Sequence, residues 1–484
     1  MQPHPLKLAL VALGLFAWGG LRTAEARTGT AIRSVEPGRR RLERPNVVFV
    51  RTDDETASAM GVRKADGAFV MQHVLDDIAN EGVSFSNSFV SFSLCSPSRA
   101  TFLTGQYAHH HHVIANAGAH GGYAALDHSN TLAVWEARNG YYTCHVGKYL
   151  NSYTGGIAPG WNEWYTSFVS HYFDYDVNEN GTVVHYGNAD GDYVTDVETD
   201  QAVEFIRARN YGSRPFFLVV DYTAPHGTSP AVPGIGIFPV PAPWYGAVFA
   251  DFAPHWPPNF DERNVSDKPP FVQALPLLDR DAVGQVIADE RAVYGTLLSV
   301  DEGVARIVAA LDANGMLDNT FIFFTSDNGM ERGDHRIANG KNHMYEESIR
   351  VPLFVRGPGI ARGVTVPSVV ANIDYAPTIV ELTGATAGFE MDGTSLVPLL
   401  TGSSTFRRDG ILLESYDGAA QQPVGLRTDE YSYGEYADGF VELYVLNDDP
   451  YELQNQAYNP LYTNAIGPLH ARLQALRFAQ PGGR

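Results

Sequence analysis

Three short, continuous apolar runs constrain the fold of this 484-residue chain more than any other feature. They comprise residues 47–50, 216–220 and 321–324, and polar residues follow each run closely. Apolar runs of this length, bounded by turn residues, are typical of central strands in a parallel sheet that is buried on both faces. Helical patterns such as residues 288–313, closed by an Asn-Gly pair, lie between them. The sequence therefore predicts an α/β fold with a doubly wound, mostly parallel sheet flanked by helices.

The polar residues after these runs predict a cation site. Asp53 and Asp54 follow the first run, His226 comes shortly after the second, and Asp327 and Asn328 follow the third. The carboxyl ends of parallel strands meet at one edge, where doubly wound folds place their sites. The Asp and Asn side chains offer oxygen ligands, which favour calcium, or less strongly magnesium, over zinc. The Asp53-Asp54 pair alone would also fit a helix cap, and Asp327-Asn328 alone would fit a turn. Together the two pairs favour a shared cation site.

The remaining parts of the chain predict a leader and a second, smaller unit. Residues 1–26 have the pattern of a secretory signal peptide, and residues 27–44 are expected to form a flexible leader. The main catalytic domain is expected over residues 45–405, with an antiparallel-sheet subdomain over residues 406–484. No segment after the signal peptide is apolar enough to span a bilayer. We therefore expect a secreted, periplasmic or extracellular protein without stable membrane insertion.

The net charge of the chain argues against some classes of ligand. The formal net charge is -21 at pH 7, and such an acidic chain lacks the basic footprint that nucleic acids require. The same field repels any anionic substrate, so local cations have to capture it. A Pro- and aromatic-rich stretch at residues 231–271 shows no periodicity, which favours a functional loop or lid.

The chain contains two cysteines, Cys95 and Cys144. In an exported protein they could form one disulfide. Alternatively, Cys95 is reactive and Cys144 is a buried thiol. A lone cysteine before a helix is more often a small buried hydrophobe than a functional group. These interpretations exclude one another.

The segment that begins at Cys95 favours a functional role for this cysteine. Its sequence is CSPSRATFLTG, at residues 95–105. The spacing of Cys95, Pro97 and Arg99, followed by Leu-Thr-Gly, resembles the signature of the type I sulfatases, which belong to the alkaline-phosphatase-like superfamily. In that family a formylglycine-generating enzyme oxidises the cysteine to formylglycine (3-oxoalanine). The hydrated aldehyde of formylglycine is then the catalytic nucleophile.

Further segments resemble motifs of the same family, in order and over nearly the whole chain after the leader. They are the two metal motifs at residues 52–54 and 325–329, two lysine segments at 147–151 and 341–346, and a histidine segment at 224–226. The resemblance implies an alkaline phosphatase/sulfatase-like fold. It also implies one calcium ion, bound by Asp53, Asp54, Asp327, Asn328 and the formylglycine oxygen at position 95.

The resemblance further assigns roles to four basic residues. Arg99 would steady the hydrated aldehyde, Lys148 and Lys341 would bind sulfate oxygens, and His226 would lie near the bridging oxygen. One hydroxyl of the hydrate would attack sulfur, and His226 or a lysine would protonate the leaving alcohol. The second hydroxyl would then expel sulfate and restore the aldehyde.

Within the family, Gly-Lys-Tyr-Leu-Asn at residues 147–151 resembles the branch that contains the N-acetylglucosamine-6-sulfatases. The expected substrate is therefore a sulfated sugar of the N-acetylglucosamine 6-sulfate type, although small aryl sulfates also fit. His109 and His111 are candidate substrate-binding residues in a run of four histidines. Glu331 stands where many relatives have a histidine, which removes a possible cation near the sugar.

Three alternatives remain open at this point. A broad arylsulfatase would prefer esters with good leaving groups. A formylglycine-dependent phosphodiesterase or phosphonate monoester hydrolase would share the fold and the nucleophile. A non-catalytic protein that binds sulfated glycans would keep Cys95 unmodified.

Overall fold

The computed structural model describes residues 44–209, 214–231, 237–403, 406–417 and 420–481. The predicted signal peptide, residues 1–26, and all but Arg44 of the predicted leader lie outside this part of the chain. Among the described residues no helix is both long enough and apolar enough to cross a membrane.

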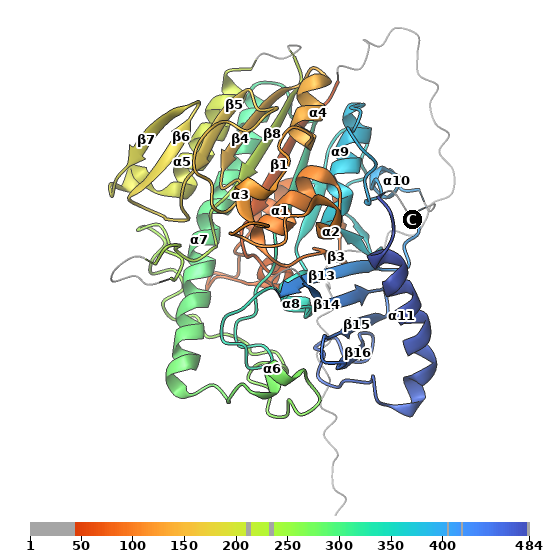
Figure 1. The fold of residues 1–484 in the computed structure, drawn as a ribbon. Coiled ribbons are helices and arrows are strands. Elements are labelled where there is room, and N and C mark those ends of the chain that lie inside the picture. The colour runs from red at the N-terminus through yellow and green to blue at the C-terminus, as the bar shows by residue number, and fades with distance from the viewer. Residues whose placement is uncertain (1–43, 210–213, 232–236, 404–405, 418–419, 482–484) are drawn as a thin grey trace, which may run out of the picture. The chain divides into compact units, whose positions relative to one another are not determined.

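Ten strands of the described chain form one large sheet, in the spatial order β11-β2-β10-β9-β1-β8-β4-β5-β6-β7 (Figure 1). Their bounds are β1 Asn46–Thr52, β2 Val83–Phe85, β4 Tyr142–Gly147, β5 Glu163–Ser167, β6 Tyr175–Glu179, β7 Thr182–Tyr186, β8 Phe216–Asp221, β9 Thr320–Ser326, β10 Leu353–Arg356 and β11 Val364–Val366. The five central strands, from β9 to β5, run parallel, whereas β10, β6 and β7 pair antiparallel with their inner neighbours. This confirms the predicted mostly parallel sheet.

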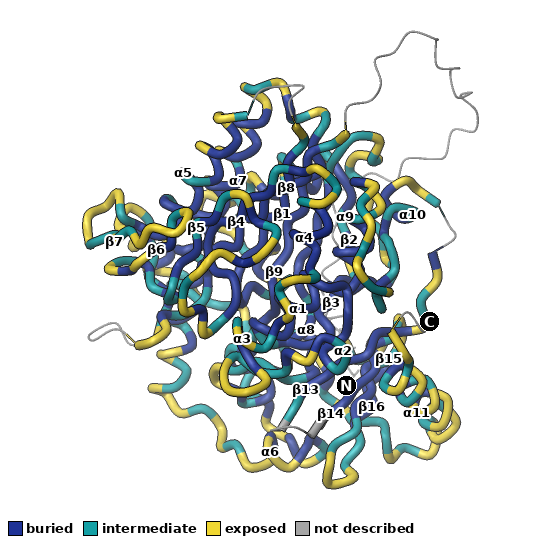
Figure 2. The backbone as a smooth tube through the Cα atoms, turned by 45° about the horizontal axis from the view of Figure 1, so that its top comes forward, coloured by how far each residue is buried: buried dark blue, intermediate teal, exposed yellow. Residues whose placement is uncertain are grey.

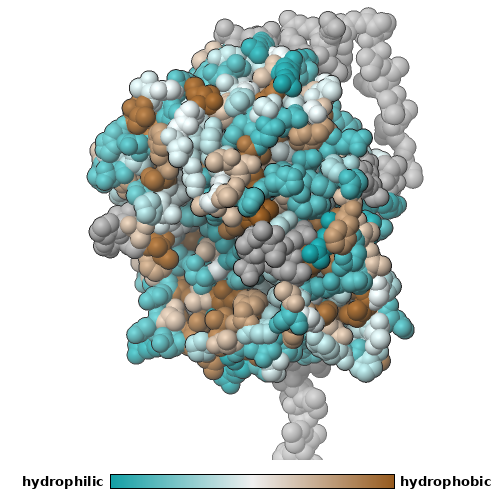
Figure 3. Space-filling view, viewed as in Figure 1, coloured by the Kyte–Doolittle hydropathy of each residue, from teal (hydrophilic) through white to brown (hydrophobic). Residues whose placement is uncertain are grey.

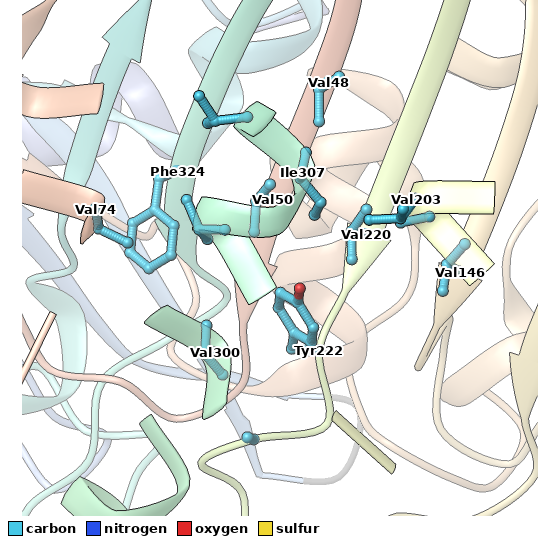
Figure 4. Packing of buried hydrophobic residues seen from close by; sticks show 14 of the residues in the cluster. Val48, Val50, Val74, Val146, Val203, Val220, Tyr222, Val300, Ile307 and Phe324 are labelled. Carbon is cyan, nitrogen blue, oxygen red and sulfur yellow. The ribbon is translucent and has the colours of Figure 1, made fainter. Parts of the chain in front are cut away.

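The three apolar runs lie in adjacent strands, β8, β1 and β9, at the centre of the sheet. Their side chains alternate between two apolar cores. Val48 and Val50 of β1 pack with residues of α5 and α7, whereas Val47 and Phe49 pack with α1, α4 and α9 on the opposite face. Figure 4 shows the first of these cores, in which Val50 lies between Phe324 and Val220 and close to Ile307. Each such buried Val stabilises the fold by roughly 1.5–3 kcal/mol relative to an exposed one.

Helices cover both faces of the sheet. Their bounds are α1 Cys95–Thr104, α2 Ala108–His111, α3 Gly122–Ala125, α4 Leu132–Arg138, α5 Val194–Arg207, α6 Pro270–Gln273, α7 Arg280–Ala313, α8 Glu346–Ile349, α9 Tyr375–Thr383, α10 Val397–Leu400 and α11 Thr463–Arg477. Short 3-10 or π turns span Ala57–Gly61, Val74–Ala79, Asp190–Asp192, Leu317–Asn319, Asn372–Asp374 and Pro460–Tyr462.

The predicted helix at residues 288–313 is the C-terminal part of α7. The helix begins earlier than expected because the Asp279 side chain accepts a hydrogen bond from the backbone N–H of Ala282 at 2.8 Å, which caps the helix. The predicted end is confirmed: α7 stops at Ala313, and Gly315 then adopts a φ of 65°.

Four antiparallel strands form a second sheet in the C-terminal region, in the order β13-β14-β15-β16. Their bounds are β13 Ile411–Asp417, β14 Ala420–Arg427, β15 Tyr431–Glu435 and β16 Val441–Val445, and a separate two-stranded sheet pairs β3 Ser88–Phe89 with β12 Val370–Ala371. Residues of α11 share an apolar core with this four-stranded sheet. The predicted antiparallel C-terminal sheet is confirmed, while its boundary at residue 405 stays a prediction.

The Pro- and aromatic-rich stretch has little regular structure. From residue 237 to residue 269 the described chain forms neither a helix nor a strand, and α6 follows directly. In Figure 2 the central strands are buried, whereas α6 and much of α11 lie at the surface. Figure 3 shows that the face in view is mostly hydrophilic, with hydrophobic residues gathered mainly in its lower part.

Candidate active site

Strand register brings the predicted metal ligands together. Thr52, the last residue of β1, pairs with Ser326, the last residue of β9. The residues that follow, Asp53 and Asp327, therefore leave the same edge of the sheet side by side. Carboxylate oxygens of Asp53, Asp54 and Asp327 lie within 4.8 Å of one another. We call these three residues the aspartate cluster.

Asn328 completes the predicted ligand set. Its Nδ2 donates a hydrogen bond to Asp54 at 2.5 Å, whereas its fully buried Oδ1 has no hydrogen-bond partner among the described residues. Asp54 itself has a φ of 70°, an unusual backbone conformation for a non-glycine residue. A buried oxygen without a partner, beside three buried carboxylates, fits a hard cation that takes only oxygen ligands. The residues present could therefore bind a divalent metal.

Cys95 lies directly beside this cluster. It is the first residue of α1 and is fully buried. Its Sγ lies 2.9 Å from Lys341 Nζ, 3.7 Å from Lys148 Nζ and 3.6 Å from an oxygen of Asp53. Burial, followed by the charge of Asp53, raises the pKa of the thiol to about 11. An unmodified Cys95 is therefore neutral at pH 7 and poorly suited to act as a thiolate nucleophile.

The beginning of α1 offers fewer free N–H groups than a helix N-terminus usually does. The Ser96 N–H, which would be free at an uncapped helix start, donates to Asn116 Oδ1 at 2.9 Å. Pro97 has no N–H to donate. The local sequence thus directs anion binding toward the side chains around Cys95 more than toward the helix backbone.

Arg99 supports the aspartate cluster from within the protein. It is fully buried, and its guanidinium donates to Asp327 Oδ2 at 2.8 Å, to Asp53 Oδ2 at 3.1 Å and to the Lys148 carbonyl. Burial opposes its charge, but Asp327 and Asp53 outweigh burial and raise its pKa further. In this geometry Arg99 orients the two carboxylates.

The two lysines and the histidine reach the same cluster from other elements. Lys148 follows β4 and pairs with Asp53, and Lys341 pairs with Asp54 at 2.5 Å. His226 follows β8, and its Nε2 lies 3.7 Å from Asp54 Oδ2. These contacts unite all the residues that the resemblance singled out, apart from the histidine run.

Ionisation in the cluster follows from these contacts. Burial opposes the charge of Asp53, but Lys148, His226 and Arg99 hold its pKa well below its usual value. Burial and the neighbouring Asp53 raise the pKa of Asp327 to about 6. Burial and the charge of Lys148 lower the pKa of His226. The site therefore has a high charge density and is closed to most solvent.

The two candidate histidines of the run contact other protein groups. His111 is buried: its Nδ1 accepts from the Val113 N–H at 3.1 Å, and its Nε2 pairs with Thr101 Oγ1 at 3.1 Å. His109 pairs with Glu414 at 2.8 Å. Both ring nitrogens of His111 are thus used within the fold, which favours a structural role for it. A substrate contact of His109 stays a prediction.

A buried network below the site was not predicted from the sequence. Asp221, the last residue of β8, accepts two hydrogen bonds from Arg51 at 2.9 and 2.7 Å and one from His145 at 3.1 Å. Arg99 also lies 3.5 Å from Asp221. Burial opposes the charge of Asp221, yet Arg51 and the other basic neighbours lower its pKa to about 2. Arg51 and Asp221 each directly follow an apolar run in the sequence. The parallel register of β1 and β8 pairs these two residues, and this is the signal from which the network could have been found.

Both cysteines are free thiols in the structure. Cys144 lies in β4 and packs within the apolar core of α5 and α7. The disulfide alternative is therefore wrong, and Cys95 is available at the site.

Comparison with known proteins decides the family. The sequence profile described as Sulfatase matches residues 45–385, and the profile described as N-sulphoglucosamine sulphohydrolase, C-terminal, matches residues 333–479. This chain belongs to the sulfatase family. It is accordingly a sulfuric ester hydrolase.

The relatives of this sulfatase agree with that assignment. It is 32% identical to the N-acetylglucosamine-6-sulfatase of Homo sapiens, over 90% of this chain and 84% of the human protein. It is 28% identical to the N-acetylglucosamine-6-O-sulfatase of Bacteroides thetaiotaomicron, over 87% and 84% of the two chains. A protein solved in complex with its substrate, D-glucosamine-2-N,6-O-disulfate, is 25% identical with a TM-score of 0.74, covering 91% of this chain and 100% of its own.

Proposed function

We propose that this sulfatase removes the 6-O-sulfate from N-acetylglucosamine or glucosamine units of a sulfated glycan. Formylglycine formed from Cys95 would be the nucleophile, and one calcium ion would be bound beside it. The observation that carries this proposal is the placement of Cys95, buried between Lys148, Lys341 and the aspartate cluster. The names of the relatives and the bound disulfate of the solved structure support the class of sugar.

Calcium fits the donor atoms of the site. Asp53, Asp54, Asp327 and the unpartnered Oδ1 of Asn328 supply only oxygen, the ligand type that calcium prefers. When bound, calcium and the hydrated aldehyde would supply, respectively, charge neutralisation for the sulfate and a nucleophilic oxygen. Lys148 and Lys341 now pair with the carboxylates, and a cation bound there would leave both ammonium groups available to the substrate.

The basic residues of the site would have separate roles in the reaction. Lys341 and Lys148 flank position 95 and would bind the sulfate oxygens, whose negative charge otherwise repels a nucleophile. Arg99 would hold Asp53 and Asp327 at a fixed separation. His226, at the open side of the cluster with 15% of its side chain exposed, would lie near the leaving oxygen of the sugar. Because these groups are fixed before substrate arrives, little reorganisation is needed during reaction.

We further propose that residues 1–26 direct export, that residues 45–405 form the catalytic domain and that residues 406–484 form the C-terminal subdomain. The four-stranded sheet, whose strands lie within residues 411–445, supports the C-terminal subdomain. A formylglycine-generating enzyme would be the partner that activates the protein.

A substrate panel tests the proposed function. Protein co-expressed with a formylglycine-generating enzyme is assayed on N-acetylglucosamine 6-sulfate, D-glucosamine-2-N,6-O-disulfate, 4-nitrophenyl sulfate and bis(4-nitrophenyl) phosphate. Release of sulfate from the two sugars, with little phosphate diester cleavage, is expected. Preferential cleavage of the phosphate diester would favour the phosphodiesterase alternative, and turnover of the aryl sulfate alone would favour a broad arylsulfatase.

A further inference from the structure

The loop that carries Lys341 also carries a histidine–glutamate pair. The Glu331 N–H donates to the Gly340 carbonyl at 2.8 Å, and the Gly340 N–H donates back to the Glu331 carbonyl at 3.2 Å. This reciprocal pairing closes residues 332–339 into a loop. It also places the Glu331 side chain beside the next residues, where its Oε1 lies 3.0 Å from His343 Nδ1.

Residues 341–343 run alongside the segment that leads into α1. The Asn342 N–H donates to the Ser93 carbonyl at 2.9 Å, and Ser93 Oγ donates to the His343 carbonyl at 2.8 Å. Lys341, two residues before His343, reaches Cys95. His343 is thus fixed beside the residues proposed to bind sulfate.

The Glu331 side chain favours the protonated form of His343. Glu331 is fully buried, and its Oε2 has no hydrogen-bond partner in the described part of the chain. A buried carboxylate needs a cation or donor nearby, and His343 is the group within reach. Burial opposes the charge of His343, but Glu331 outweighs burial and raises its pKa. An imidazolium that donates from Nδ1 to Glu331 has a second N–H to offer at Nε2.

The His343 ring borders both solvent and an aromatic side chain. The His343 side chain is 26% exposed, and within the described residues its hydrogen bonding is limited to Nδ1. The Phe271 ring stacks on the imidazole, with centroids 5.2 Å apart and planes at 20°. Phe271 belongs to α6, at the end of the predicted functional loop, and is 40% exposed. An exposed aromatic ring beside a charged donor suits a sugar, which has both apolar C–H faces and oxygen acceptors.

We propose that His343, held by Glu331 and flanked by Phe271, is a binding site for the sugar that carries the sulfate ester. His343 donates a hydrogen bond from Nε2 to an oxygen of this sugar or of its anionic substituent, and Phe271 packs against the ring. Glu331 is the positioning residue for His343. This inference rests on the proposed function. Glu331 stands where many relatives have a histidine, and His343 would take the place of that histidine as the basic group near the sugar.

The test compares sugar and aryl esters. His343→Gln should lower the ratio of kcat/KM for N-acetylglucosamine 6-sulfate to that for 4-nitrophenyl sulfate by about 10-fold or more, because a charge-assisted hydrogen bond to the sugar is lost. Glu331→Gln should lower the same ratio by a smaller factor, because it keeps a hydrogen bond to Nδ1 and removes the charge. His185→Gln is the matched control, since His185 of the edge strand β7 pairs with Asp176 of β6 at 2.9 Å. An unchanged ratio in His343→Gln, or equal losses on both esters, would overturn the inference.

Binding separates this inference from the proposed function. Calorimetry measures the Kd of D-glucosamine 6-sulfate in the Cys95→Ala background, with and without His343→Gln, and the Kd of inorganic sulfate serves as reference. A Kd ratio of sugar to inorganic sulfate that rises about 10-fold supports the sugar site even if neither ester is hydrolysed. An unchanged ratio overturns it whatever the activity. Circular dichroism confirms that each variant is folded.

Discussion

Two clusters of largely buried titratable residues in this sulfatase each offer three possible metal ligands but differ in charge. The aspartate cluster, Asp53, Asp54 and Asp327, and a second group, His335, Glu347 and Glu452, each bring three possible ligand atoms within 4.8 Å. Lysine and arginine side chains contact the first cluster directly. In the second group, which we call the glutamate cluster, burial and then Asp334 raise the pKa of Glu347 well above its usual value. Burial and then Glu346 raise that of Glu452 to about 8.

The difference shows that neighbouring cations, more than the acidic residues themselves, decide what such a cluster can do. Arg99, Lys148 and Lys341 stabilise Asp53 and Asp54 in the charged form, which suits a site for a cation and an anionic ester. The glutamate cluster instead holds protons and joins parts of the fold. Glu452, after β16, accepts a hydrogen bond from the Glu346 N–H at the start of α8 at 2.9 Å.

The largest expected effect comes from removing the proposed nucleophile of the aspartate cluster. Cys95→Ala should lower turnover of N-acetylglucosamine 6-sulfate by more than about 10⁴-fold while the folded structure and calcium binding persist. Cys144→Ala is the matched control, since Cys144 is the other buried free thiol and lies in β4, away from the cluster contacts. Steady-state kinetics measure both, and substantial activity in Cys95→Ala would contradict the assignment.

The next largest effect contrasts the two clusters directly. Asp327→Ala should weaken calcium binding and reduce turnover by about 10²-fold or more, because it removes a ligand and one of the carboxylates that pair with Arg99. Glu347→Ala should leave calcium affinity nearly unchanged. Isothermal titration calorimetry with calcium measures both variants. Equal losses of affinity would mean that the metal is not bound by the aspartate cluster.

A lysine near each cluster provides a third test. Lys341→Met should lower kcat by about 10²–10³-fold, because a cation that stabilises charge in the transition state is lost. Lys268→Met is the control: Lys268 is fully buried and pairs with Glu262 at 3.4 Å, and Glu262 in turn contacts His335 of the glutamate cluster. We expect that variant to lose stability more than rate. A normal kcat for Lys341→Met would remove this lysine from the reaction.

The sequence predicted the aspartate cluster but not the glutamate cluster, and the reason is physical. Asp53 and Asp327 directly follow long apolar strands, so parallel pairing alone brings them together. His335, Glu347 and Glu452 come from a loop, a short helix and the C-terminal region, and no periodicity relates them. The Glu331–His343 pair depends likewise on the closure of one loop.

The limits of sequence reasoning also show in single residues. The apolar run of β8 predicted a buried strand, yet the buried ion pair of Asp221 with Arg51 required knowledge of which strands are neighbours. His111 lies in a run of four histidines, but its ring contacts Thr101 and Val113 inside the fold. Local composition cannot distinguish such a structural histidine from a substrate ligand.

The smallest expected effect concerns stability. The folded protein binds the Glu452 proton more tightly than the unfolded chain does, since the pKa rises from the usual 4.5 to about 8. The unfolding free energy of the wild type should therefore fall between those pH values, and Glu452→Gln should remove part of this fall. Relative to the wild type, the unfolding free energy of the variant should increase by on the order of 1–3 kcal/mol as pH rises through this window. Urea unfolding at pH 5 and pH 8 measures it; parallel changes in both proteins would show that Glu452 is ionised when folded.

The central claim is that the aspartate cluster surrounds a modified cysteine. The most direct measurement is the mass of the proteolytic peptide that contains position 95, from protein co-expressed with a formylglycine-generating enzyme. We predict the mass of an aldehyde in place of the thiol. An unmodified thiol under these conditions would contradict the proposed mechanism and leave the cluster as a binding site.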